Sequence, residues 1–149
     1  MNKLVTTILA GVLCTTAACA SRDQTPAEST ASTAELENTY WKVMTIGGAP
    51  VVVKENQREP HMVFHSEGNR LAAFAGCNQM SGTYEVDGAK LKLSRMATTM
   101  MACEDGMEQE QALHEALGNV ATWVIRGESL DLLDADGKPV ATFESRYLR

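Results

Sequence analysis

The sequence predicts a mainly β protein in which an antiparallel sheet of about eight or nine strands curls, with one short helix covering or plugging an opening. Two observations indicate the sheet. From Leu36 onward, short apolar runs alternate with turn residues, and residues 82–93 have the pattern of a tight hairpin. The helix is indicated by residues 105–120, where apolar side chains recur at helical spacing.

The expected strands are the apolar runs bounded by turn residues. The first ends at Gly47-Gly48, and a turn at 66–69 joins the third and fourth into a hairpin. The last three follow one another through short turns and form a meander. In order, the runs are Tyr40–Ile46, Val51–Lys54, His61–His65, Arg70–Ala75, Gly82–Val86, Ala89–Leu93, Thr122–Arg126, Ser129–Leu133 and Pro139–Ser145.

The hairpin at 82–93 is the clearest local prediction. Asp87-Gly88 suits a type I′ turn, in which both central residues have positive φ. After the turn, leucines at 91 and 93 alternate with lysines at 90 and 92. This alternation predicts leucines on the buried face and lysines in water.

The helix is expected to begin with a capping box. Asp105 would accept hydrogen bonds from the first-turn amides and Glu108 would reach back. Gly118-Asn119 would end the helix and leave Val120 just outside it. The expected buried face contains Leu113, Ala116, Leu117 and Val120, and the expected solvated face contains Glu108, Glu110 and Glu115.

Length and charge narrow the functional classes. The 149 residues suit one domain, and 13 Lys plus Arg against 19 Asp plus Glu give a net charge of −6. An acidic chain without a basic run is a poor partner for nucleic acid or anionic lipid. Neither the Gly-x-Ser-x-Gly nucleophile pattern nor a phosphate-binding glycine loop occurs. We therefore expect no enzyme and no cofactor.

The N-terminus has the pattern of a signal peptide at residues 1–18. Lys3 precedes an apolar run, Leu4–Leu13, that is too short to span a membrane. The segment Thr16-Ala17-Ala18-Cys19 resembles a bacterial lipoprotein cleavage box, with Cys19 the lipidated residue. The alternative is an ordinary signal peptide cut after Ala18 or Ala20. The mass of the mature N-terminus distinguishes the two.

Residues 19–35 are expected to form a tether between the lipid and a domain at 36–149. The segment 21–35 contains no large apolar side chain, so it cannot bury enough surface to offset its ordering entropy. Ala20 after the cysteine favours the outer membrane, facing the periplasm. The expected location is thus the bacterial cell envelope, with the lipid as the membrane contact.

Cys77 and Cys103 are the two cysteines left after processing at Cys19. In an oxidising compartment two such thiols indicate a disulfide first. Two buried free thiols and a soft-metal site are the alternatives.

A cluster of methionines surrounds these cysteines: Met80, Met96, Met100, Met101 and Met107. Thioethers are ligands for Cu(I), but methionine also fills irregular cores. Without a repeated methionine array or a histidine-rich tract, packing is favoured and no metal site is expected. His61 and His65, four apart on a strand, would be more than about 10 Å apart, which is too far for one metal ion. These two and His114, alone on the helix, are expected at the surface or in turns.

With these residues in view, the chain resembles the META domain (HslJ-like) family over residues 36–143. The resemblance rests on a set of short motifs, of which Gly-Cys-Asn paired with Met-Ala-Cys is the most specific. They are Tyr40-Trp41, Gly47-Gly48, Gly76-Cys77-Asn78, Ser81-Gly82, Tyr84, Leu91, Thr99–Cys103, Glu110, Leu130 and Gly137.

The resemblance implies a cracked or pseudo β-barrel of about eight strands with one short α-helix, similar to pilotin lipoproteins. It also implies an envelope protein linked to heat shock and to tolerance of novobiocin, with no catalytic residues. Two hypotheses follow. One is a non-enzymatic lipoprotein that binds or braces an envelope protein during stress, and the other is a module that binds a small apolar molecule or lipid in a slot of the barrel.

The motif residues themselves are interpreted as architectural: Gly76, Asn78, Ser81, Gly82, Tyr84, Met101 and Ala102. Asn78 is expected to hydrogen-bond its own backbone in the turn after Cys77. The stretch 76–103 would then hold the hairpin between two cysteines and support a functional surface elsewhere.

Overall fold

The computed structural model describes residues 34–146, which form nine strands, one 3₁₀ helix and one α-helix. The elements are β1 (Tyr40–Ile46), β2 (Ala49–Pro50), β3 (His61–His65), η1 (Glu67–Asn69), β4 (Arg70–Phe74), β5 (Gln79–Asp87), β6 (Lys90–Thr98), α1 (Met107–Gly118), β7 (Thr122–Arg126), β8 (Ser129–Leu133) and β9 (Pro139–Arg146).

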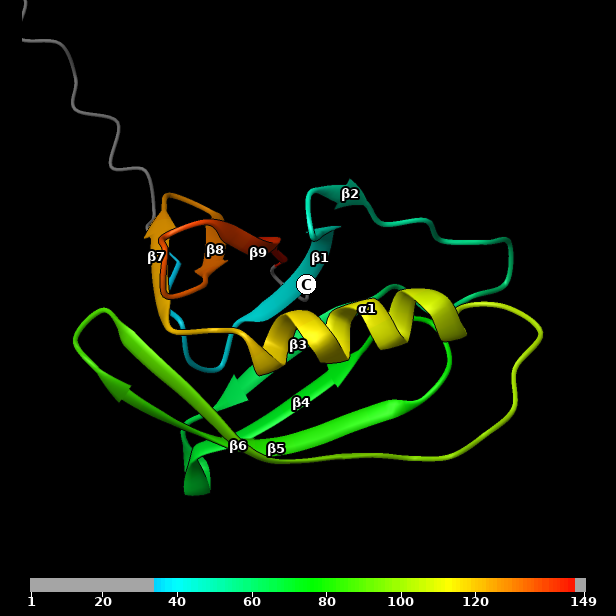
Figure 1. The fold of residues 1–149 in the computed structure, drawn as a ribbon, viewed down its shortest axis with the longest axis horizontal. Coiled ribbons are helices and arrows are strands. Elements are labelled where there is room, and N and C mark those ends of the chain that lie inside the picture. Colours follow the sequence, from blue (N-terminus) through cyan, green and yellow to red (C-terminus); the bar gives the residue numbers. More distant parts are fainter. Residues whose placement is uncertain (1–33, 147–149) are drawn as a thin grey trace, which may run out of the picture. The chain divides into compact units, whose positions relative to one another are not determined.

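The strands form an antiparallel sheet that closes into a ring (Figure 1). From β3 to β9 each strand pairs with the next in the chain, β1 pairs with β3, and β9 pairs back with β1. The short β2 pairs with the end of β1, outside the ring. This architecture confirms the predicted fold class, a mainly β protein with one helix.

The weakest join in the ring lies between β6 and β7. These strands share a single pair of residues, Lys90 and Thr122. Beyond it, β6 continues toward the connection that leads to α1, and this connection swings wide past the N-terminal end of the helix in Figure 1. Leu113, Ala116 and Leu117 of α1 are buried in the core. The helix therefore covers an opening of the ring, as predicted.

Large side chains pack together inside the ring. Trp41, Phe64, Tyr84 and Phe143 are all buried. The Trp41 indole N–H donates to the Leu36 carbonyl oxygen (2.9 Å), and the Phe64 and Tyr84 rings meet edge to face at 5.1 Å. Such packing is typical of a solid core and leaves the interior filled with side chains.

The predicted second strand, Val51–Lys54, does not form. The pairing with β1 ends at Pro50, and the Val52 N–H instead donates to Gln109 Oε1 of α1 (2.9 Å). Val52 and Val53 are exposed. The β-branched run predicted a strand, but after Val51, whose N–H donates to the Met44 carbonyl oxygen (3.0 Å), the backbone bonds to a side chain of α1 instead of to a strand.

The Asp-Gly hairpin forms one residue later than predicted. Asp87 pairs with Lys90, so Gly88 and Ala89 are the central turn residues. Of these, Gly88 has a positive φ of 58°, as the first central residue of a type II′ turn requires. Leu91 is buried and Leu93 is half-buried against the core, while Lys90 and Lys92 are exposed. The turn type was wrong, but the predicted faces are confirmed.

The predicted capping box is also wrong. Gly106, with φ of 89°, is the N-cap, and no side chain caps the helix there. Asp105 forms an ion pair with Lys54, and Glu108 is exposed. The predicted helix end is confirmed, because α1 ends at Gly118 and Val120 lies beyond it.

Tyr84 is a buried phenol whose ionisation is opposed by its surroundings. Its hydroxyl donates to the Glu37 carboxylate (2.6 Å). Burial first, then this hydrogen bond and the negative charge of Glu37, raise the pKa of the Tyr84 phenol above its ordinary value of 10.0.

We expect the Tyr84→Phe variant to lose less free energy of unfolding than the wild-type protein as the pH rises above 10. The folded state holds the phenol proton more tightly than the unfolded state, so stability is fully present below pH 10 and falls as pH rises toward the folded pKa. The variant should be less stable at neutral pH by about 1 kcal/mol, for the lost hydrogen bond, and should decline less above pH 10. Urea unfolding at a series of pH values checks this. Parallel declines in both proteins would contradict it.

The predicted signal peptide, Cys19 and the tether up to residue 33 lie outside the described residues. At the start of the domain, Ala34 is already buried and its N–H donates to the Gly127 carbonyl oxygen (3.0 Å). Among residues 34–146, no helix is both long enough and apolar enough to cross a membrane.

Candidate functional site

A disulfide joins Cys77 to Cys103, with 5.9 Å between the Cα atoms. Cys77 lies between β4 and β5, and Cys103 lies in the connection between β6 and α1. The bond therefore ties the start of the β5–β6 hairpin to the chain just before the helix. Of the three readings that the sequence left open, the structure contains the disulfide.

Two glycines allow the backbone to come together beside this disulfide. A Cβ placed on Gly106 would lie 2.8 Å from the carbonyl carbon and oxygen of Gly76, a distance that real Cβ atoms do not adopt. Both glycines have positive φ, 142° for Gly76 and 89° for Gly106. The motif residue Gly76 is thus architectural, and Gly106 is its unpredicted partner.

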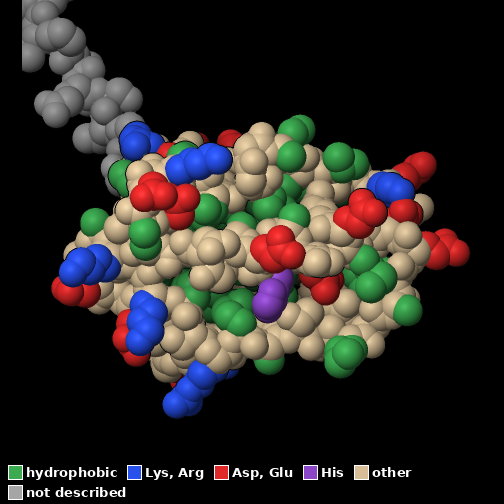
Figure 2. Space-filling model, viewed as in Figure 1, with side chains coloured by type: hydrophobic (Ala, Val, Ile, Leu, Met, Phe, Trp, Pro, Cys, Tyr) green, Lys and Arg blue, Asp and Glu red, His purple; other side chains and the backbone are tan. Residues whose placement is uncertain are grey.

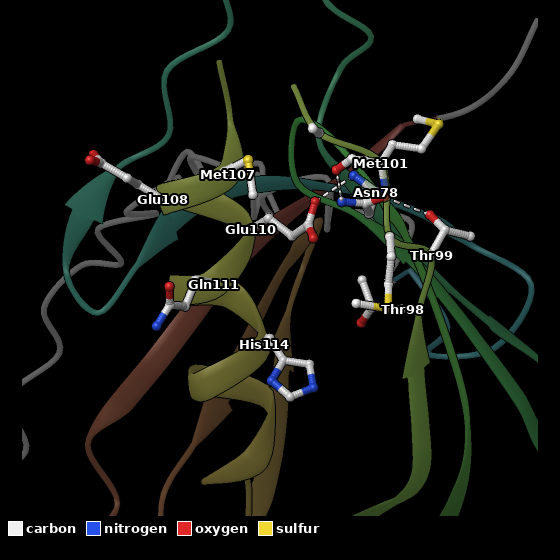
Figure 3. A pocket seen from close by; sticks show the side chains of 11 residues that line it. Asn78, Thr98, Thr99, Met101, Met107, Glu108, Glu110, Gln111 and His114 are labelled. Atoms are coloured by element: carbon white, nitrogen blue, oxygen red, sulfur yellow. Dashed lines mark hydrogen bonds between the residues drawn. The ribbon is translucent and has the colours of Figure 1, made fainter. Parts of the chain in front are cut away.

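The Asn78 side chain forms hydrogen bonds with residues 99–101, which precede Cys103. Its side chain is buried, and Oδ1 accepts from the Thr99 hydroxyl (2.9 Å) and the Met101 N–H (2.7 Å), as Figure 3 shows. Its Nδ2 donates to the Met101 carbonyl oxygen (3.2 Å). The predicted bond of Asn78 to its own turn is wrong: the side chain reaches across to residues 99–101 and holds them in place.

The first turns of α1 are fastened to the same region. The Glu110 carboxylate accepts from the Asn78 backbone N–H, and Gln109 Nε2 donates to the Ala75 carbonyl oxygen (2.6 Å). Glu110 is therefore half-buried and bonded, not part of a solvated face as predicted, whereas Glu108 and Glu115 are exposed as predicted. Asn78 consequently connects the helix to the segment opposite it.

Between α1 and residues 98–102 lies a surface cleft of about 550 Å³, which we call the methionine cleft. Figure 3 shows residues of α1 along one wall, Thr98 and Thr99 along the other, and Asn78 with its hydrogen bonds between the walls. The lining residues are Asn78, Thr98, Thr99, Met100, Met101, Ala102, Met107, Glu108, Glu110, Gln111 and His114.

Three methionines of the cleft are exposed to solvent. The exposed fraction is 98% for Met100, 59% for Met101 and 50% for Met107. By contrast Met80 is buried and Met96 is half-buried against the core. The prediction that the methionine cluster fills the core is confirmed for these two and wrong for the three in the cleft.

The cleft carries negative charge. Glu108 and Glu110 line it together with the exposed His114, and no lysine or arginine is among its lining residues. Figure 2 shows hydrophobic and acidic side chains around a histidine near the middle of this face, with lysines and arginines toward the edges of the view. The surface thus combines apolar thioethers with carboxylates.

The described residues contain no cluster of three or more His, Cys, Asp and Glu side chains able to hold a metal ion. His61 is half-buried and stacks on Tyr40, with ring centroids 4.7 Å apart, so it is less exposed than predicted. His114 lies on the exposed face of α1, as expected of a surface histidine.

The remaining motif residues divide between two roles. Gly82 lies where the register of β5 and β6 shifts, and an added Cβ would be 2.4 Å from Met96 Sδ and 2.9 Å from the Ser94 carbonyl oxygen. Ser81 pairs beside it on the exposed side of β5. Met101 and Ala102 are exposed and line the cleft. The close packing of the hairpin explains why residue 82 is a glycine. Nothing in the packing of the fold explains why Met101 and Ala102 are exposed.

Two solved structures have a fold similar to that of this chain. A protein from Burkholderia xenovorans, solved by NMR, is 22% identical with a TM-score of 0.61, covering 76% of this chain and 85% of its own. A second NMR structure is also 22% identical with a TM-score of 0.57, covering 73% of this chain and 90% of its own. No curated protein matches the chain. The model of the META domain matches residues 34–147, and the chain therefore belongs to the META domain family.

Proposed function

We propose that this protein is a non-enzymatic envelope lipoprotein that binds a partner protein through the methionine cleft, in the context of stress or antibiotic tolerance. The cleavage box at Cys19 supports the envelope location, and the lipid would hold the domain beside the membrane. The partner segment we propose is an amphipathic helix with apolar residues on one face and lysine or arginine beside them.

The observation that carries this proposal is the exposure of methionines on a rigid support. Thr99 and Met101, on either side of Met100, are held by Asn78, and the disulfide at Cys103 fixes the chain just beyond them. A fold that only needed to connect β6 to α1 would have no reason to present apolar side chains from a fastened segment. Exposed apolar patches of this kind mark interaction sites.

The residues that line the cleft indicate which groups a partner would carry. Methionine is unbranched and polarisable, so a surface of methionines adapts to apolar side chains of different shapes, and a groove beside a helix suits an amphipathic helix. Glu108 and Glu110, without a lining lysine or arginine, favour basic groups at the rim. Val52, exposed in an adjoining depression that shares Met107 and Glu108, extends the apolar surface.

The alternative, a small apolar ligand inside the sheet, has less support. Trp41, Phe64, Tyr84 and Phe143 are buried in the interior where such a slot would be. This packing favours a surface site.

A short amphipathic peptide of leucine and lysine provides the test. We expect it to bind the purified protein, and we expect the combined change Met100→Ser, Met101→Ser and Met107→Ser to weaken binding at least about tenfold. Full burial of one methionine is worth about 1.5–3 kcal/mol, and partial burial of three exceeds the ~1.4 kcal/mol of a tenfold change. Isothermal calorimetry measures the affinities.

Met44→Ser is the matched control, because Met44 is exposed on β1 and lies outside the cleft. It should leave the affinity unchanged, and a leucine–glutamate peptide should bind far more weakly than the leucine–lysine peptide. Equal affinities for the wild-type and cleft-variant proteins would refute the proposed site. An unchanged urea midpoint shows that the variants remain folded.

A further inference from the structure

We propose that the methionine cleft is a reversible oxidation site, at which conversion of Met100, Met101 and Met107 to sulfoxides releases the bound partner. This inference rests on the proposed function, because it assigns a regulation to the same surface. It starts from the location of the most exposed methionines. Met100 and Met101 lie on one side of a single cleft and Met107 lies on the other.

The chemistry requires an oxidant of the hydroperoxide class. The thioether sulfur attacks the terminal oxygen of a hydroperoxide, the O–O bond breaks as the S–O bond forms, and the peroxide leaves as water or alcohol after proton transfer. Sulfur loses two electrons and the peroxide gains them. A sulfoxide is returned to the thioether by a reductase that consumes two thiols and yields a disulfide and water.

Access to solvent decides which methionines react. Met100, Met101 and Met107 are 98%, 59% and 50% exposed, whereas Met44 outside the cleft is 40% exposed and Met62 and Met80 in the core are at most 1% exposed. The two remaining thiols of the domain are already joined as the Cys77–Cys103 disulfide, so they do not compete for peroxide as thiolates would. The cleft thioethers are therefore the preferred targets in this part of the chain.

Oxidation would change the surface without unfolding the domain. The side chains that become polar are outside the core, and the backbone at 99–101 is held by Asn78 through bonds that do not involve sulfur of these residues. A sulfoxide carries a strong acceptor oxygen where the apolar partner would pack, so burying it without a donor costs free energy. Loss of partner affinity with an unchanged fold is the expected result.

The test combines mapping and binding. The purified protein is treated with limiting hydrogen peroxide, sulfoxides are located by peptide mass spectrometry, and the affinity for the leucine–lysine peptide is measured before oxidation, after it, and after treatment with methionine sulfoxide reductases. We expect oxidation at Met100, Met101 and Met107 before Met62 and Met80. We also expect affinity to fall at least about tenfold and to return after reduction.

A variant with Met100→Leu, Met101→Leu and Met107→Leu separates the possibilities, because leucine keeps the apolar surface and cannot form a sulfoxide. Its affinity for the peptide, whatever the starting value, should be the same before and after peroxide treatment. If wild-type protein binds and peroxide leaves the affinity unchanged, or if peroxide weakens the leucine variant equally, the oxidation proposal is wrong and the binding site stands. If untreated wild-type protein does not bind, the proposed function itself fails.

Discussion

Replacing both Cys77 and Cys103 by alanine is expected to lower the free energy of unfolding by about 3.5 kcal/mol. The two residues are 26 apart in the chain, and the loop that they close contains the whole β5–β6 hairpin. Without the bond, the unfolded chain regains the entropy of that loop, while the folded chain keeps most of its packing. The melting temperature should fall by about 10–15 °C.

Urea unfolding with and without a reductant provides the measurement and its control. Reductant should destabilise the wild-type protein by nearly the same amount and leave the alanine variant unaffected. If both proteins have the same midpoint under oxidising conditions, the bond contributes no stability and the proposed bracing of residues 99–103 loses its main support.

Gly106→Ala is expected to destabilise the protein by about 3 kcal/mol. The left-handed φ of 89° costs about 1 kcal/mol for a residue with a Cβ. The added methyl would also lie 2.8 Å from the backbone of Gly76, so the two segments would have to separate, and such overpacking costs about 1–3 kcal/mol. Thermal and urea unfolding measure the loss.

Gly137→Ala is the matched control for this change. Gly137 has a similar φ of 78°, but an added Cβ there meets no atom within 4 Å. It should cost about 1 kcal/mol, for the backbone conformation alone. The difference between the variants then reports the contact between Gly76 and Gly106, and equal losses would show that this contact adds nothing.

The parts of the fold that depend on local pattern were predictable. The expected bounds of β1, β3, β7 and β8 agree with the structure because turn residues delimit each run. The Asp87-Gly88 pair located the hairpin, but its exact register depends on pairing across the whole β5–β6 ladder, where a shift between Ser81 and Thr83 also occurs. Sequence pattern fixes the elements, and long-range pairing sets the register.

The parts that depend on distant contacts were not predictable from one sequence. Asp105 had the spacing of a cap, but Gly106 takes a left-handed conformation against Gly76, and Lys54 pairs with Asp105. Asn78 suggested a hydrogen bond to its own turn, whereas the partners of its side-chain oxygen are more than 20 residues away. Gly106, in the first turn of the expected helix, was the one available signal of the close approach.

The candidate site was also only partly predictable from the sequence. The methionines around the disulfide were evident in the sequence, but composition alone could not separate the buried Met80 from the exposed Met100. The difference arises because Met80 lies on the buried side of β5, while Met100 lies in the connection between β6 and α1. Whether a methionine at 99–101 is exposed depends on how the folded chain holds this segment, so the sequence alone does not reveal it.

The central claim is that the methionine cleft is the surface that binds a partner. The most direct measurement is an NMR titration of protein labelled with ¹³C at the methionine methyl groups, using the leucine–lysine peptide. The account predicts that the methyl signals of Met100, Met101 and Met107 shift, while those of Met62 and Met80 in the core and of Met44 on β1 stay in place. Shifts at Met44 equal to those in the cleft, or signals from the cleft that do not move at saturating peptide, would contradict it.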